Sequence, residues 1–139
     1  MARLGSTIVF GDFSAYKVWS AVYNDYADYI PLKKGEEIKA GMCYYETGEG
    51  LALCNKRNQF GAFGICSDKF GYATGKKENA IPISIGGIVL AYVDKVYKTG
   101  TLLINNEHGI LTKAKRRERY NALAMYMKKN DNKHWVKIK

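Results

Sequence analysis

Turn-forming residues divide this chain into short segments, and their spacing restricts the fold more than any other feature of the sequence. Glycine, asparagine and aspartate signals recur at intervals of roughly 8 to 12 residues, and the segments between them are rich in aromatic and β-branched residues. Segments of this length and composition are typical of strands. The pattern predicts a mainly β domain, either a sandwich or a barrel-like sheet. A mixed fold with one helix is the alternative.

Six segments have the composition of strands. They are Ala15–Tyr23, Gly41–Glu46, Leu51–Asn55, Gly61–Cys66, Ile81–Asp94 and Leu102–Ile104. Thr47–Gly50 is predicted to join the second and third of them as a hairpin turn. The glycines of Gly61–Cys66 indicate a neighbour close to that backbone. In the longest segment, Gly86 and Gly87 allow a bulge or a sharp bend midway.

The C-terminal part of the chain allows two interpretations. Thr112–Tyr120 contains residues of good helix propensity, so we expect a short helix there. Asn121–Met127 could extend that helix. The turn residues Asn130–Asn132, followed by His134–Lys139, instead indicate a closing β-hairpin. We favour the hairpin for this second part.

Composition indicates a single domain without a membrane-spanning helix. The chain has 139 residues and 47% hydrophobic content, which suffices for one core. Its longest apolar stretch, residues 81–93, is interrupted by proline, serine and glycine and is shorter than the roughly 18 to 20 residues of a membrane helix. The N-terminus lacks the apolar stretch of a secretory signal. We therefore expect neither membrane insertion nor export through a membrane.

The cysteines and histidines give no sign of a metal or cofactor site. Cys43, Cys54 and Cys66 are odd in number and fit neither a disulfide framework nor the pairs of a zinc site. We expect buried thiols in a reducing cytoplasm. His108 lies in a predicted turn and His134 near the chain end, so both are expected to be surface or packing residues. The sequence also lacks phosphate-loop, esterase and zinc-protease motifs.

Much of the formal net charge of +9 lies in two clusters. The first contains Lys113, Lys115, Arg116, Arg117 and Arg119, and the second Lys128, Lys129, Lys133, Lys137 and Lys139. Such clusters usually form a solvated face. They also suit a partner subunit or an acidic polymer of a host surface. Because no nucleic-acid-reading motif accompanies them, a basic nucleic-acid-binding module is only the third interpretation of this chain.

Asn24, Asp25 and Asp28 are the strongest candidates for catalytic residues in this sequence. A carboxyl group beside a peptide bond acts at high effective concentration. A second carboxyl nearby lets one of the two hold a proton while the other activates water. The side-chain amide of Asn24 offers another route, by attack on its own carbonyl. Asn-Asp is also a common turn dipeptide, so the residues alone leave open a purely structural role.

A resemblance favours the chemical role. Residues 21–29, Ala-Val-Tyr-Asn-Asp-Tyr-Ala-Asp-Tyr, resemble the opening motif of the autoproteolytic intramolecular chaperone domains at the C-termini of phage neck appendages and tail spikes. Later landmarks occur in the same order, and the resemblance spans about residues 18–139. These landmarks are Lys34–Glu36, Phe63–Gly71, Ile81–Ile83, Gly86–Val93 and Lys98–Leu103. The chain has Asp28 where the family usually has Glu, and Gly87 where it has Arg.

The resemblance implies a self-processing assembly domain. Residues 25–139 would form a homotrimeric β-rich chaperone that helps a parent spike to fold and trimerise, and residues 1–24 would be the upstream segment. The chain would cut itself between Asn24 and Asp25, with Asp25 and Asp28 as the catalytic carboxylates. Aromatic residues would pack the site and the seam between subunits, namely Trp19, Tyr23, Tyr26 and Tyr29.

The same resemblance implies a location and leaves a rival function. The domain would act in the host cytoplasm during phage assembly and, if retained, would remain on the virion tail or neck. The alternative is an uncleaved trimeric spike tip that binds a host surface through its Lys/Arg clusters and exposed tyrosines. No cofactor and no membrane partner are implied.

Overall fold

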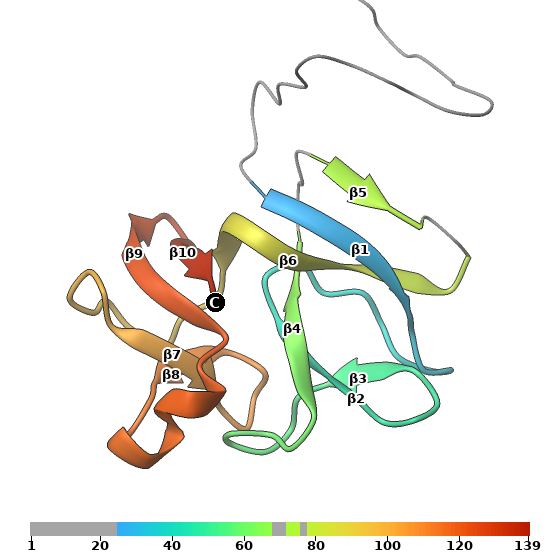
Figure 1. Cartoon of the computed structure of the whole chain (residues 1–139), viewed down its shortest axis with the longest axis horizontal. Coiled ribbons are helices and arrows are strands. Elements are labelled where there is room, and N and C mark those ends of the chain that lie inside the picture. Colours follow the sequence, from blue (N-terminus) through green and yellow to red (C-terminus); the bar gives the residue numbers. More distant parts are fainter. Residues whose placement is uncertain (1–24, 68–71, 76–77) are drawn as a thin grey trace, which may run out of the picture.

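Strand β6 (Ala80–Ala91) runs through the middle of the molecule and joins two groups of strands (Figure 1). The computed structural model describes residues 25–67, 72–75 and 78–139. The strand predicted for Ala15–Tyr23 lies outside these ranges, as do Trp19, Tyr23 and Asn24. The described part confirms a mainly β fold, and its sheet curls into an open half-barrel.

In the described residues, ten strands make up this sheet. Eight of them follow the order β3-β2-β4-β6-β10-β9-β7-β8, while β1 pairs with β6 and β5 pairs with β1. The first group is β1 (Asp25–Pro31), β2 (Cys43–Glu46), β3 (Leu51–Leu53), β4 (Ala62–Cys66) and β5 (Tyr72–Thr74). The second is β7 (Leu102–Asn105), β8 (Leu111–Lys113), β9 (Ala124–Asn130) and β10 (Lys133–Ile138). The N-terminal part of β6 pairs with β1 and β4, and its C-terminal part pairs with β10.

A bulge in β6 confirms the irregularity predicted at its glycine pair. Ser84 pairs with Ala27 and Gly86 with Tyr26, so Ile85 has no partner on β1. An extra residue of this kind bends a strand and increases its twist. The Ile85 side chain is 54% exposed as a result.

The sheet around β2 and β4 is buried on both faces. Cys43 and Ile65 belong to one hydrophobic cluster, which extends to β6, β7, β9 and β10. Their neighbours Tyr44 and Cys66 belong to a second cluster, against which residues of β1 and β3 pack. Successive residues of a strand point to opposite faces, so each strand here contributes to both clusters. All three cysteines are buried free thiols, as expected.

Burial also sets the ionisation of polar groups in these clusters. The Tyr44 hydroxyl donates to the Glu37 carbonyl at 2.6 Å and accepts from the Lys39 amide at 2.9 Å. Burial raises the pKa of Tyr44 to about 12 and that of the Cys54 thiol to about 12. Both groups therefore stay protonated at neutral pH.

The predicted hairpins are present, whereas the predicted helix is only partly so. β2 pairs with β3, and β9 pairs with β10 around a turn with Asp131 at φ 43°. The residues expected to start the helix form β8 instead, because Leu111 and Thr112 are buried in the sheet. What remains is a 3₁₀ helix, η1 (Arg116–Asn121), with no buried residue. Such a segment has no apolar face that would stabilise a longer helix.

Among the described residues, no helix is long and apolar enough to cross a membrane. The described helical structure is the single short η1 segment.

The close approach predicted for the Gly61–Cys66 segment occurs at Gly64. A Cβ atom placed on Gly64 would lie 2.7 Å from Cγ2 of Ile83, a residue that is 1% exposed. We expect Gly64→Ala to destabilise the protein by about 1–3 kcal/mol, because the added methyl overpacks a buried strand pair. Urea unfolding measures the effect.

The matched control is Gly86→Ala, since Gly86 also lies in a strand and a Cβ there would meet no atom within 4 Å. Equal midpoints for the two variants would contradict the close packing at Gly64.

Candidate functional site

Asp25, the first residue of β1, has a buried carboxyl group. It is 2% exposed, and its Oδ2 atom accepts hydrogen bonds from the hydroxyls of Ser67 at 2.6 Å and Ser84 at 2.7 Å. Both serines are 3% exposed. The three residues come from β1, from the position just after β4, and from β6. They meet because β6 pairs with β1 and with β4.

The backbone fixes both serines in place. The Ser67 amide donates to the Pro82 carbonyl at 2.8 Å, which continues the pairing of β4 with β6. Ser84 is paired with Ala27 on one side and with Ile65 on the other. The two hydroxyls are therefore held by strand register, and they require no adjustment to reach the carboxyl group.

Hydroxyl donors make this burial possible. A carboxyl group removed from water is costly unless it is hydrogen-bonded. Within the described part of the chain, no lysine or arginine forms an ion pair with Asp25. In the described residues, Ser67 and Ser84 donate side-chain hydrogen bonds to this carboxyl group. The backbone nitrogen of the same residue, Asp25, is part of the Asn24–Asp25 peptide bond.

Asp28 lies elsewhere on the same strand. Burial alternates at the start of β1, with Asp25 and Ala27 buried and Tyr26 58% exposed. A separation of three residues therefore places the Asp28 side chain on the opposite face from Asp25, about 10 Å further along the strand. Asp28 is half-buried. One copy of β1 therefore does not bring the two carboxyls together.

The other expected site residues are only partly described. Asn24, Trp19 and Tyr23 lie outside the described residues, and Tyr29 is half-buried on β1. Gly87, at the position where the resembled family has Arg, pairs directly with Asp25. It has φ 91°, a conformation that favours glycine. Opposite Asp25, strand β6 therefore has a glycine in place of the family's cationic side chain.

Sequence reasoning missed Ser67 and Ser84, although one signal was available. Ser84 interrupts a run of β6 in which residues 80–84 are all buried. A hydroxyl in a strand buried on both faces needs a partner, and Asp25 is that partner. Its identity follows from strand pairing between residues 59 positions apart, which no local pattern reveals.

His134 forms a second buried polar contact, away from Asp25. Its Nδ1 atom and the Tyr126 hydroxyl are 2.7 Å apart, and His134 is 6% exposed. The pKa of His134 is lowered, first by burial and then by Lys129, against a smaller opposing effect of Asp94. In the described ranges, no group of three His, Cys, Asp or Glu side chains could hold a metal ion.

Comparisons with known proteins give a likeness of fold. No family model matches the sequence, and no curated protein matches it. The fold belongs to a class that also occurs within a bacteriophage protein of known structure. That structure is the pre-mature form of bacteriophage phi29 gene product 12, with a TM-score of 0.68 and 11% sequence identity. The match covers 92% of this chain but 23% of the phi29 chain, so this chain corresponds to less than a quarter of that protein's length.

Loss of either serine hydroxyl should destabilise the fold. We expect Ser67→Ala and Ser84→Ala each to cost about 1–3 kcal/mol, because each leaves the buried Asp25 carboxyl with one donor fewer. The control is a double-mutant cycle with Asp25→Ala, in which the serine changes should cost much less. Urea unfolding of the single and double variants gives the coupling energy. Additive costs would contradict the contact.

His134 should make the fold sensitive to mild acid. Its folded pKa lies below its unfolded value of about 6.5, so the unfolded chain binds the proton more readily as the pH falls below 6.5. Stability is then lost on going from pH 7 to pH 5. We expect His134→Phe to flatten this pH dependence of the unfolding free energy. His108→Gln, at an exposed histidine, should leave it unchanged, and equal slopes for both variants would refute the assignment.

Proposed function

We propose that this chain is the folding and assembly domain of a phage tail spike or neck appendage, and that it cuts itself between Asn24 and Asp25. The observation that carries the proposal is the buried Asp25 carboxyl, held by two hydroxyls at the start of the sheet and directly after the bond to be cut. The motif resemblance at residues 21–29 and the likeness of fold to part of phi29 gene product 12 support it.

In the proposed reaction, Asp25 acts as the acid and Asp28 as the base. Asp28 takes a proton from water, and the water oxygen adds to the carbonyl carbon of Asn24. When the C–N bond breaks, the Asp25 carboxyl gives its proton to its own departing nitrogen, which is one short side chain away. This is general acid–base catalysis by a carboxyl pair.

Trimerisation would complete the pair. Within one chain the two carboxyls lie on opposite faces of β1, so the base comes from Asp28 of a second copy. Tyr26 and Ile85, at 58% and 54% exposed, provide apolar contact surface near the register position of the cut. Cleavage that needs two copies would start only after assembly, which makes the cut a check on correct folding.

Intact-mass measurement tests the proposal. Incubation of the assembled protein should give fragments of 24 and 115 residues, the second being 139 minus 24. Asp25→Asn and Asp28→Asn should each slow cleavage by at least ~100-fold, the usual scale of a lost general acid or base. The matched control is Asp131→Asn, in the β9–β10 turn at φ 43°, where asparagine is well tolerated. A single intact species after prolonged incubation would overturn the catalytic claim.

A mixing experiment tests the contribution of two copies. Asp25→Asn and Asp28→Asn chains, inactive alone, are unfolded together and refolded as mixed assemblies. Cleavage should reappear in the mixture, because one chain supplies Asp25 and another Asp28. Failure of the mixture to cleave, with wild-type chains cleaving after the same treatment, would place both roles within one chain.

An uncleaved tip that binds a host surface is the second candidate. Phe60 and Tyr120 are 96% and 98% exposed and flank a hollow of about 530 Å³ that Asn58, Gln59 and Asn121 also line. Exposed aromatic side chains beside a hollow are typical of binding sites. An intact mass together with loss of cell binding in a Phe60→Ala, Tyr120→Ala variant would favour this function over self-cleavage.

A further inference from the structure

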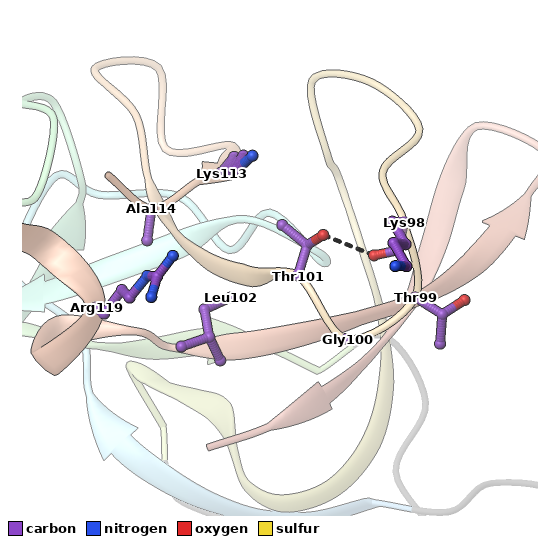
Figure 2. Close-up of a pocket in the computed structure, with 8 residues that line it drawn as sticks. All are labelled: Lys98, Thr99, Gly100, Thr101, Leu102, Lys113, Ala114 and Arg119. Atoms are coloured by element: carbon purple, nitrogen blue, oxygen red, sulfur yellow. Dashed lines mark hydrogen bonds between the residues drawn. The ribbon is translucent and has the colours of Figure 1, made fainter. Parts of the chain in front are cut away.

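A hollow lined by three cations lies in the second group of strands, far along the chain from Asp25. It has a volume of about 450 Å³ and opens between the Lys98–Thr101 turn, the end of β8 and η1. Lys98, Lys113 and Arg119 line it, and no acidic residue does. In Figure 2 the Arg119 guanidinium points from η1 toward the turn. Three separate elements therefore each contribute a basic residue to the lining.

These charges are not neutralised by the carboxylates of the described residues. None of the three cations forms an ion pair there. Glu118, the acidic neighbour of Arg119 in sequence, instead accepts two hydrogen bonds from Arg57, at 3.0 and 2.8 Å. That contact lowers the pKa of Glu118, so Glu118 is ionised at neutral pH. Its negative charge is paired with Arg57 and not with Arg119. The hollow is left with a positive potential that an anion would balance.

One wall of the hollow, the Lys98–Thr101 turn, is held by hydrogen bonds within the protein. The Thr101 hydroxyl donates to the Lys98 carbonyl at 2.7 Å, and the Thr99 hydroxyl donates to the Met127 carbonyl at 2.7 Å. The Gly100 amide donates to the Tyr126 carbonyl at 2.9 Å. These bonds tie the turn to itself and to β9. A site formed in advance loses little conformational entropy on binding.

Size and charge narrow the class of ligand. A phosphate monoester carries a charge of about −1.5 to −2 at pH 7, which suits three convergent cations better than a single carboxylate does. Arginine binds phosphate and sulfate oxygens through two parallel N–H donors, and lysine acts as a point charge. The volume of about 450 Å³ exceeds that of one oxyanion. Leu102 and Ala114 supply the apolar part of the lining.

We propose that this hollow is a binding site for a phosphate or sulfate monoester of a small hydroxylated molecule, such as a sugar. Arg119 and Lys98 hold the oxyanion from opposite walls, and Lys113 adds a third charge. The carbon skeleton of the ligand lies against Leu102. This binding is independent of the proposed self-cleavage, because its residues share no contact with Asp25, Ser67 or Ser84.

Calorimetric titration of the full chain tests the site, with glucose 1-phosphate and glucose 6-sulfate as probes. Both esters should bind, whereas glucose should not. Inorganic phosphate should bind more weakly than its ester, because it does not contact Leu102. Equal affinity for inorganic phosphate and the ester would overturn the assignment of an ester, and no binding of either at millimolar concentration would overturn the site.

Matched variants separate the hollow from the general positive charge of the protein. Lys98→Gln and Arg119→Gln should each weaken ester binding by at least ~10-fold. Arg117→Gln removes the same charge from the same 3₁₀ helix, at a residue that does not line the hollow, and should change binding less than ~2-fold. Equal losses for Arg117→Gln and Arg119→Gln would show a diffuse electrostatic effect and refute the site. Tighter binding to duplex DNA than to either ester would also refute it.

Discussion

The pairing of β6 with three different strands is the constraint on which the rest of the structure depends. Its first part contacts β1 and β4, and its last part contacts β10. Residues 80–84 are buried on both faces, so their side chains cannot move to the solvent side by a slip of register. The bulge at Ile85 then turns the strand from one group to the other. The Asp25 site and the sheet of the second group are both positioned by this one strand.

Local chemistry made some of this fold predictable. The turn Thr47–Gly50 and the residues around Asp131 set two hairpins, and the glycine pair in β6 set a bulge. The helix prediction was only partly right, because helix propensity takes no account of burial. Leu111 and Thr112 are buried in the sheet, and residues 116–121 have no apolar face that would stabilise an α-helix. The parallel pairing of β1 with β5 joins segments more than forty residues apart, and no local pattern marks it.

The candidate site was also predictable only in part. The sequence pointed to Asp25 through a motif at residues 21–29, and the structure adds that its carboxyl is buried. Ser67 and Ser84 escaped notice because their partner lies on another strand. The spacing of Asp25 and Asp28 looked favourable in the linear sequence, yet a period of two places them on opposite faces. The sequence shows the three basic residues of the hollow but not that they lie together. Folding brings Lys98 close to Lys113 and Arg119, which belong to the first basic cluster.

The position of β1 has a consequence for what a break in the backbone would do. Asp25 is the first residue of the strand, and all seven residues of β1 pair with β6. A chain end created immediately before Asp25 would therefore leave each described strand with the same neighbours. Scission at that point therefore keeps every interstrand pairing of the described strands in place.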